Sequence, residues 1–581
     1  MRIDTRDAPP RTVWALEQAG VHPLLARLFA GRGVRSADEL EASLATLLPP
    51  AGLLGAADAA HLLADAIGAG SRICVVADYD CDGATACAVT LRGLKLLGAD
   101  PSTLAYVVPD RRLHGYGLTP AIVDLAIERA APEVLVTVDN GIASLEGVAH
   151  AAARGLIVVV TDHHLPAHID GRVVLPDADV VVDPNQPGCS FASKHLAGCG
   201  VAFYVLLALR AELRERGEFE IAEQPRLDAL LDLVALGTVA DVVRLDRNNR
   251  CLVAQGLKRI RAGRMQPGIA ALFAVAGRDP REASAADFGF ALGPRLNAAG
   301  RLADMTLGIE CLLTDDAARA EEIAAALDAI NRERRSVETG MRDDAEALID
   351  RALAAAGGVE RAFAIFDPSF HEGVVGIIAA RLKDRLHRPT FVFALGQDGL
   401  LKGSGRSVEG LHLRDALDLV SKRAPLLLKR FGGHAMAAGC TIALADLDAF
   451  RIALHGAAAS LAATPSEQRV ATDGPLADEH WNAATVRLLE REVWGAAFEA
   501  PVFCDAVEIV SQRLVGDKHT KLAVRMNGTV REAIWFGRVE PVAGRVRLAY
   551  RLCLDSYNGE ERLQMVIVAA VGDGDATVPP A

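Results

Sequence analysis

The chain has 581 residues, too many for one hydrophobic core, because single cores stop growing at about 250–300 residues. We therefore expect three or four domains. Hydrophobic residues make up 51% of the chain and charged residues 24%, a composition that excludes an intrinsically disordered protein. The net charge of −13 argues against a histone-like binder of nucleic acid, but it leaves room for a local basic channel.

The N-terminal sequence contains no apolar signal segment, and no run approaches the roughly 18 uncharged apolar residues that a membrane span requires. We therefore expect a cytoplasmic protein with no membrane partner. The ten cysteines are scattered without a CxxC pair, so the sequence predicts neither a disulfide framework nor a zinc knuckle.

Residues 1–70 are predicted to form a helical segment, because apolar residues recur at spacings of three and four. In residues 71–250, short β-branched runs alternate with helical stretches. These runs are ICVVA (73–77), VLVTV (134–138), LIVVV (156–160) and DVVVD (179–183). Apolar strands separated by helices are typical of a parallel sheet covered on both faces, so we expect an open α/β domain.

Three further regions follow along the chain in the predicted domain organisation. Residues 251–350 are predicted to be connector helices, with an apolar stripe between charged residues near the end. A second α/β domain follows in residues 351–462. Residues 467–575 are β-rich, and their hairpin-like runs predict a small β-barrel similar to an OB fold.

Aspartate follows the predicted strands of the first α/β domain. The acids are Asp78, Asp80 and Asp82 after the first strand, then Asp139, Asp162 (followed by His163 and His164) and Asp183. The carboxyl ends of parallel strands form the ligand crevice, where clustered acids repel one another unless cations lie between them. Asp183 taken alone is more typical of a turn or N-cap residue. Together the acids and histidines favour Mn²⁺ or Mg²⁺, since thiolates at metal spacing are missing from the sequence.

The DxDxDG pattern from Asp78 also resembles the beginning of a calcium-binding EF-hand loop. Such a loop needs a glutamate at its twelfth position, which is Val89 here. It also needs a helix before the loop, whereas ICVVA is predicted to be a strand. The sequence therefore excludes an EF-hand.

Four segments carry a resemblance to a known family. DYDCDG (78–83), VDNG (138–141), TDHH (161–164) and GTVADVV (237–243) resemble, in order, the motifs of the DHH phosphoesterase superfamily. Members of this superfamily hydrolyse phosphate esters and anhydrides with a pair of divalent metals. PDRRLHGYG (109–117), GPRLNAAGRL (293–302), GSGRS (403–407) and GGHAMAAG (432–439) extend the resemblance to its bacterial single-stranded-DNA exonucleases over nearly the whole chain.

The resemblance implies a two-metal site. Its ligands would be Asp80, Asp82, Asp139, His163 and Asp241, with Asp78 left open as an outer ligand. His164 would contact phosphate, and Asp162 would orient it or a ligand. Two cations about 3.5–4 Å apart would then activate a water as the nucleophile.

The resemblance also implies residues that hold the nucleic acid. A terminal phosphate would be bound by Ser404, Arg406, Ser407 and either Arg111 or Arg112, while Arg295, Asn297 and Arg301 would guide the following phosphates. Tyr116 would stack on a base or sugar, and Gly432, Gly433 and His434 would lie close to the substrate. In the barrel, Lys518, Lys521, Arg525 and Trp535 are candidate DNA contacts.

The sequence thus predicts a metal-dependent 5′→3′ exonuclease that acts on single-stranded DNA in recombination and repair. Expected partners are single-stranded DNA with a free 5′ end, a helicase and a single-strand-binding protein, and we expect a monomer. One alternative is a DHH-type oligonucleotidase or cyclic-dinucleotide phosphodiesterase, although those enzymes are shorter and lack a barrel. Another is a catalytically inactive replication scaffold, which predicts missing acids, whereas all of the implied ligands are present.

Overall fold

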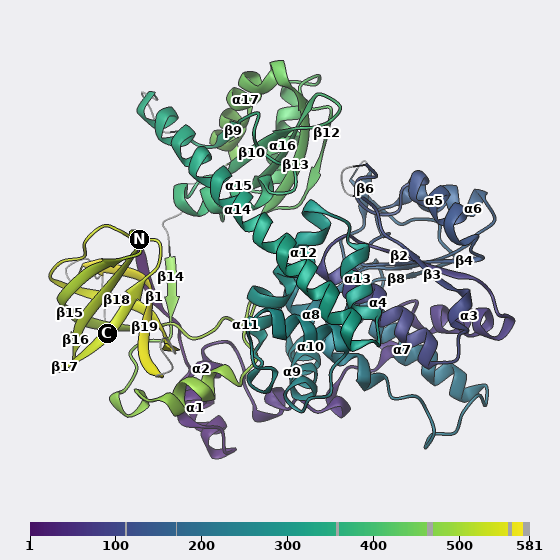
Figure 1. Ribbon diagram of the computed structural model, residues 1–581, viewed down its shortest axis with the longest axis horizontal. Helices are drawn as coiled ribbons and strands as arrows, with labels where there is room; N and C mark the ends of the chain where they lie inside the picture. The colour runs from purple at the N-terminus through teal and green to yellow at the C-terminus, as the bar shows by residue number, and fades with distance from the viewer. Residues whose placement is uncertain (111–112, 170, 356–359, 462–468, 556–560, 573–581) are drawn as a thin grey trace. The chain divides into compact units, whose positions relative to one another are not determined.

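The computed structural model describes residues 1–110, 113–169, 171–355, 360–461, 469–555 and 561–572. The chain divides into two compact units, of which the larger contains Ile3–Asp328 and Val470–Ala581. The smaller unit contains Ala329–Arg469 together with Met1–Arg2. Figure 1 shows the elements of both units.

A five-stranded parallel sheet lies at the centre of the first α/β domain, with strand order β3-β2-β4-β5-β8. The strands are β2 (Ile73–Ala77), β3 (Leu104–Val107), β4 (Val134–Val138), β5 (Ile157–Thr161) and β8 (Val180–Val182). Alternate residues of β2 enter different cores. Ile73 and Val75 pack in the core that includes α3 (Ala56–Ala69), α4 (Cys81–Leu96) and α7 (Gly198–Glu215). Cys74 and Val76 pack in the core that includes α5 (Pro120–Ala130) and α6 (Leu145–Ala153), so the predicted sheet with two covered faces is confirmed.

Helices fill the rest of the larger unit up to its boundary. They are α8 (Leu231–Ala240), α9 (Arg247–Arg261), α10 (Pro267–Val275), α12 (Gly293–Leu302), α13 (Thr306–Leu313) and the start of α14 (Ala317–Ala355), with a π-helical turn at Phe288–Leu292. α4 packs against α7 and α8, so the helix that follows the first aspartate motif contacts the helix that ends at Asp241.

The C-terminal residues form the predicted closed barrel, with strand order β15-β16-β17-β19-β18. Its strands are β15 (Phe503–Val515), β16 (His519–Met526), β17 (Thr529–Trp535), β18 (Arg545–Asp555) and β19 (Arg562–Gly572). Beside it, the N-terminal strand β1 (Arg2–Thr5) pairs with β14 (Arg469–Thr472). The sequence predicted only helices in the first 70 residues and missed β1, because four residues carry too little periodicity to identify a strand.

The smaller unit is also α/β, but its sheet is mixed, with order β12-β13-β11-β10-β9. β9 (Phe363–Phe366) and β10 (Thr390–Leu395) are parallel, whereas β11 (Leu400–Arg406), β12 (Arg430–Gly433) and β13 (Ala437–Ala443) pair antiparallel. Helices α15 (Val375–Leu386), α16 (Leu413–Arg423) and α17 (Leu447–Leu461) complete it. Phe391, Phe393 and Phe450 form an aromatic cluster in its core.

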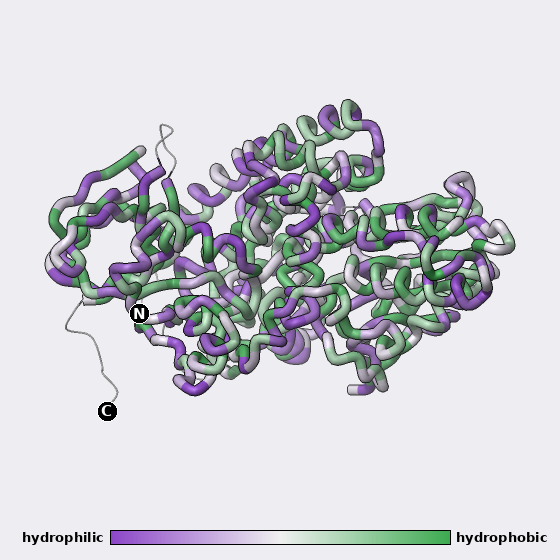
Figure 2. Tube along the Cα trace, turned by 90° about the horizontal axis from the view of Figure 1, so that it is seen from below, coloured by the Kyte–Doolittle hydropathy of each residue, from purple (hydrophilic) through white to green (hydrophobic). Residues whose placement is uncertain are grey.

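Hydrophobic and hydrophilic residues alternate along the chain over short distances (Figure 2). Among the described helices, no single one is both long and apolar enough to cross a membrane. The segments Leu44–Gly52 and Ala56–Ala69 reach that length and composition only as a pair, and they meet at 85°.

Candidate metal centre and nucleic-acid site

The carboxyl ends of neighbouring strands bring the predicted acids together. Asp78 follows β2, Asp139 follows β4 and Asp162 follows β5, and these three strands are adjacent in the sheet. Asp241 arrives from a different direction, as the C-terminal cap of α8. The topology therefore converts acids spread over 160 residues of sequence into one cluster.

The two remaining acids of the first motif lie at the N-terminus of α4. Asp80 is the N-cap, and its Oδ1 accepts hydrogen bonds from the backbone N–H groups of Asp82 (2.9 Å) and Gly83 (3.0 Å). Asp82 is fully buried. Its carboxylate accepts hydrogen bonds from the N–H groups of Gly198 (2.5 Å) and Cys199 (3.0 Å), which begin α7. Two helix N-termini thus hold these acids before any metal binds.

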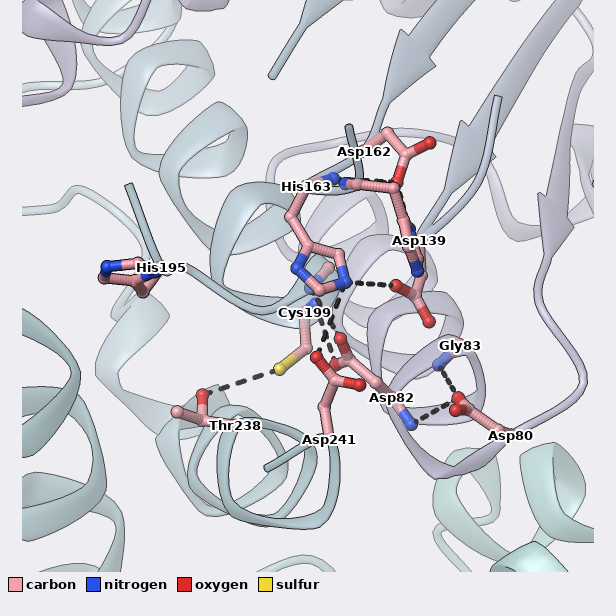
Figure 3. Close-up of polar contacts among 12 residues, drawn as sticks. Asp80, Asp82, Gly83, Asp139, Asp162, His163, His195, Cys199, Thr238 and Asp241 are labelled. Atoms are coloured by element: carbon pink, nitrogen blue, oxygen red, sulfur yellow. Dashed lines mark hydrogen bonds and ion pairs between the residues drawn. The ribbon is translucent and has the colours of Figure 1, made fainter. Parts of the chain in front are cut away.

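His163 lies between two of the acids (Figure 3). Its Nε2 is 3.0 Å from Asp139 Oδ1 and 3.4 Å from Asp241 Oδ2. Nevertheless His163 Nε2 and Asp139 Oδ1, both buried, make no hydrogen bond of good geometry within the part of the chain that the structure describes. Buried polar atoms normally have partners, so this pair is arranged to bind something between them.

Within the described part of the chain, three groups of side chains bring their ligand atoms within 4.8 Å of one another. The groups are Asp78, Asp80 and Asp139; then Asp82, His163 and Asp241; and finally Asp139, His163 and His164. Carboxylate oxygens with one or two imidazoles and no thiolate suit Mn²⁺ or Mg²⁺. The first group places Asp78 with the implied ligands, which favours a role for it at the metals.

The pKa values of the clustered acids reflect burial and mutual repulsion. Burial, and then the neighbouring carboxylates of Asp82 and Asp80, raise the pKa of Asp139 well above its ordinary value. The same two causes raise the pKa of Asp241 well above its ordinary value. Cations between these carboxylates would remove the repulsion and keep them ionised.

The pKa values of His164 and His163 are shifted in opposite directions, since burial lowers the pKa of His163. Burial also acts on His164, but the hydrogen bond to Asp162 and the surrounding carboxylates outweigh burial and raise the pKa of His164 to about 10. His164 Nδ1 lies 2.8 Å from Asp162 Oδ1, and the Tyr116 hydroxyl lies 3.2 Å from the same nitrogen. Asp162 therefore holds a cationic imidazole at the edge of the centre, where it can contact a phosphate oxygen.

Sequence reasoning missed several residues that fix this geometry. Asn185 Nδ2 donates to the His163 carbonyl at 2.6 Å, and its own N–H donates to Asp183 Oδ1 at 2.6 Å. Asp183 thus makes the turn expected for it, and burial raises its pKa to about 8. A Cβ on Gly198 would lie 2.4 Å from the Cβ of Asp139, so only glycine fits there. The glycines of LAGCG (196–200) are the one sequence signal that could have indicated this close approach.

The residues of the larger unit that were predicted to contact the nucleic acid differ in how far they are exposed. Arg295 is 8% exposed, and its guanidinium contacts Asp328 Oδ1 (2.9 Å) and the Ala291 carbonyl (2.6 Å). The expected contact with DNA does not fit this buried, charge-paired position. Arg301 is partly exposed at the end of α12, and Tyr116 is 47% exposed beside His164. Arg111 and Arg112 lie outside the described residues.

In the smaller unit, Ser404 and Arg406 lie together beside the N-terminus of α15. Arg406 Nη1 donates to Ser404 Oγ at 3.1 Å, and a Cβ on Gly376 in the first turn of α15 would lie 2.9 Å from that oxygen. Backbone N–H groups, a hydroxyl and a guanidinium at a helix start suit a phosphate. Ser407 departs from the expectation, because it is buried and its hydroxyl donates to the Leu411 carbonyl.

The glycines and histidine of GGHAMAAG lie at the end of β12. Gly432 and Gly433 belong to that strand, and the His434 N–H donates to the Ala437 carbonyl at 2.7 Å, which closes the turn into β13. Gly433 has a φ of 133°, and a Cβ on it would lie 2.4 Å from the Ala438 Cα. Position 433 therefore requires glycine for the turn itself, and the approach of Gly432, Gly433 and His434 to a substrate stays a prediction.

The candidate DNA contacts of the barrel are mostly paired. Lys521 Nζ lies 2.8 Å from Glu532, and Arg525 lies 2.8 Å from Glu508. The Arg538 guanidinium lies over the Trp535 ring, 4.3 Å from its centroid. Lys518 is exposed at the β15–β16 turn. Exposed ion pairs contribute little free energy, so phosphates can replace the acidic partners of these cations.

Comparison with known families covers most of the chain. Residues 72–238 match the N-terminal domain of the DHH family, residues 358–460 match the DHHA1 domain, and residues 472–569 match the RecJ OB domain. The single-stranded-DNA-specific exonuclease RecJ of Salmonella typhimurium is 46% identical over 561 residues, which are 94% of this chain and 96% of the relative. The corresponding protein of Escherichia coli is 45% identical, with the same coverage of both chains.

Solved structures give the same result. The crystal structure of RecJ in complex with Mn²⁺ from Thermus thermophilus is 30% identical, with a TM-score of 0.79, and the match covers 100% of this chain and 80% of that one. A structure of exonuclease RecJ bound to manganese is 35% identical, with a TM-score of 0.58 over 71% of this chain and 96% of that one.

Proposed function

The chain belongs to the RecJ family of single-stranded-DNA-specific exonucleases, and from this premise we propose that it is a metal-dependent exonuclease that hydrolyses the phosphodiester bonds of single-stranded DNA. The observation that carries the proposal is the buried cluster at the sheet edge. There His163 Nε2 and Asp139 Oδ1 face each other without a proper hydrogen bond, and further carboxylates surround them.

The proposed mechanism assigns a task to each group of side chains. Asp80, Asp82, Asp139, His163 and Asp241 would hold Mn²⁺ or Mg²⁺, with Asp78 beside Asp80. When bound, the metal pair supplies a water of lowered pKa as the nucleophile and stabilises the leaving oxygen. His164, kept cationic by Asp162, neutralises a phosphate oxygen. Tyr116 hydrogen-bonds with His164 and limits the positions of the imidazole.

We further propose that digestion runs from 5′ to 3′. Ser404, Arg406 and the first turn of α15 would bind the terminal 5′ phosphate, which supports removal of nucleotides from an end. Each predicted region would have its own role. Residues 1–70 form the N-terminal segment, 71–250 would carry out catalysis, 251–350 would connect the domains, 351–462 would recognise the end of the DNA, and 467–575 would bind the strand. In the barrel, Lys518, Lys521, Arg525 and Trp535 would contact the strand.

The cellular role is part of the same proposal. A single-strand exonuclease needs separated strands, so we expect it to act with a helicase and a single-strand-binding protein in DNA recombination and repair. We propose that it works in the cytoplasm as a monomer with single-stranded DNA carrying a free 5′ end.

An activity assay with labelled substrates tests the proposal. Wild-type protein should degrade single strands that carry a 5′ phosphate in Mn²⁺ or Mg²⁺ and should be inactive in EDTA. Asp139→Ala should reduce the rate by more than about a hundredfold, because loss of a metal ligand exceeds the 10–100-fold typical of a residue that merely supports one. Asp58→Ala changes an exposed acid of α3 and should leave the rate unchanged.

Several outcomes would contradict the proposal. Activity that persists in EDTA excludes the metal mechanism, and equal rates on blunt duplex exclude single-strand specificity. Preference for short oligoribonucleotides or cyclic dinucleotides would favour the oligonucleotidase or phosphodiesterase alternative. DNA binding without turnover in any divalent metal would favour an inactive scaffold.

A further inference from the structure

Helix α12 contacts the first aspartate motif directly. Asn297 Oδ1 accepts a hydrogen bond from the Cys81 N–H at 2.8 Å, although the two residues are 216 positions apart. One turn further along α12, a Cβ on Gly300 would lie only 2.0 Å from the Tyr79 carbonyl oxygen. The α12 backbone thus lies against the loop that contains Asp80, in a position open only to glycine.

The hydrogen bond from Cys81 completes the start of α4. The first N–H groups of a helix have no partner within the helix and need one elsewhere. Asp80 Oδ1 accepts hydrogen bonds from the N–H groups of Asp82 and Gly83. The N–H of Cys81, the fully buried first residue of α4, therefore needs another acceptor. Among the described residues, Asn297 supplies the hydrogen-bond acceptor for the Cys81 N–H.

This arrangement matters for the metals because the Asp78–Asp82 loop contributes to two of the ligand groups. Asp78 and Asp80 lie with Asp139, while Asp82 lies with His163 and Asp241. With its Oδ1 engaged as the helix cap, Asp80 can present its other oxygen to a cation. A shift of the loop would disturb both groups together.

We propose that Asn297 is a positioning residue of the metal centre, whose side-chain oxygen fixes the Tyr79–Cys81 loop and so sets the direction of the Asp80 and Asp82 carboxylates. This role replaces the phosphate contact that the sequence predicted for Asn297. The inference deepens the proposed function and rests on it. It makes α12, far along the chain from the aspartate motifs, part of the support of the metal centre.

Two substitutions at Asn297 separate its acceptor oxygen from its shape. Asn297→Leu keeps the branching at Cγ and removes the acceptor, whereas Asn297→Asp keeps the acceptor. Titration of the full-length protein with Mn²⁺ by calorimetry should show about 10–100-fold weaker binding for Asn297→Leu and retained binding for Asn297→Asp. With single-stranded DNA, Asn297→Leu should lower kcat at limiting Mn²⁺ and recover at high Mn²⁺, while KM for DNA stays at the wild-type value.

A substitution at Gly300 tests the position of the same loop independently. Gly300→Ala should also weaken Mn²⁺ binding, because the added Cβ displaces the Tyr79 carbonyl. Gly68→Ala is the matched control, since Gly68 lies in α3 with nothing within 4 Å of an added Cβ, and it should bind Mn²⁺ like the wild type. If Asn297→Leu does not fold, as judged by circular dichroism, the comparison of Gly300→Ala with Gly68→Ala decides.

A direct contact between Asn297 and the DNA would give a different result. If Asn297→Leu raises KM for DNA and reduces its salt dependence while the Mn²⁺ affinity is unchanged, Asn297 contacts phosphate and the positioning role is wrong. Wild-type protein that neither binds Mn²⁺ nor degrades single strands would overturn the proposed function, and this inference with it. Wild-type activity combined with equal Mn²⁺ affinity in all variants would overturn the inference alone.

Discussion

Two backbone outliers lie at the acids of the metal centre. Asp139 has a φ of 63°, and Val242, the residue directly after Asp241, has a φ of 62°. The left-handed region is tolerated by aspartate but is strained for a β-branched residue. Val242 is 69% exposed, so packing of its side chain does not compensate for the strain. Such strain typically persists where the surrounding structure fixes a functional geometry, here the direction of the two carboxylates.

The raised pKa values of Asp139 and Asp241 predict how metal stabilises the protein at different pH. An acid whose pKa is higher in the folded state favours folding below its unfolded pKa of about 4 and loses that contribution as pH rises. The metal-free protein should therefore lose stability with rising pH, whereas Mn²⁺ binds the ionised acids and restores it. The increase in Tm on adding Mn²⁺ should be larger at pH 8 than at pH 6, by about 2–4 °C per kcal/mol of added binding free energy.

Differential scanning fluorimetry in EDTA and in Mn²⁺ measures this difference. Asp139→Ala serves as the control, because removal of a ligand should nearly abolish the Mn²⁺ effect at both pH values. An Mn²⁺ effect that is the same at both pH values in the wild type would show that these acids are not the groups whose protons the metal displaces.

At the scale of elements, the N-terminal segment is attached to the residues that lead into the barrel. Arg32, just after α2 (Pro23–Ala30), binds Asp473 through two hydrogen bonds, at 2.8 and 3.0 Å. The side chains of Arg32 and Asp473 are 1% and 3% exposed. Arg32 also donates to the Glu499 carbonyl and lies over the Trp494 ring, 4.9 Å from its centroid. The predicted N-terminal helical segment is thus part of the larger unit, where it contacts the residues that precede the barrel strands.

Arg32→Ala should destabilise the protein strongly, because it leaves the buried Asp473 carboxylate without its main partner. Loss of one member of a buried pair costs about 3–5 kcal/mol. Arg32→Lys should recover only part of this, since an ammonium group cannot form the two parallel hydrogen bonds. Urea denaturation followed by fluorescence measures the free energy of unfolding. Arg72→Ala breaks an exposed ion pair with Glu133 and should cost less than about 1 kcal/mol. Equal effects of Arg32→Ala and Arg72→Ala would therefore contradict a stabilising role for the buried pair of Arg32 and Asp473.

At the scale of the whole molecule, a chain with a net charge of −13 is proposed to bind a polyanion. Affinity must then come from local cations such as those of the barrel, several of which form ion pairs in the DNA-free protein. Binding would exchange these acidic partners for phosphates and release counterions from the DNA.

Binding of an oligodeoxythymidine in EDTA should therefore weaken steeply with salt. The logarithm of the binding constant should fall with the logarithm of the salt concentration by about 0.7 per phosphate contact, and Lys518→Ala or Arg525→Ala should each reduce the slope by about that amount. Fluorescence anisotropy measures the slope. Lys422→Ala, which removes an exposed lysine of the smaller unit, is the control. Unchanged slopes in both barrel variants would exclude them as phosphate contacts.

The fold class and the chemistry of the metal centre could both be predicted from the amino-acid sequence. The apolar runs of the first domain predict a parallel sheet because each strand is buried on both faces, and the aspartates after them predict a metal site because parallel strands end at one edge. Such features can be predicted from neighbouring residues alone, since they depend only on the period of the strand and the position of its end. The closed barrel was predictable for the same reason, from its succession of hairpins.

The residues that support this chemistry could be identified only from the contacts between elements in the folded protein. Asn297 and Gly198 contact the first aspartate motif from segments distant in sequence, and no spacing rule connects them to it. Asn185 follows Asp183 closely, but its contact with the His163 carbonyl spans 22 positions. Arg295 has the residue type of a phosphate contact, yet it is buried against Asp328. Side-chain type fixes what a residue can bind, but burial and neighbours decide what it does bind, and both depend on contacts between elements that the linear pattern does not contain.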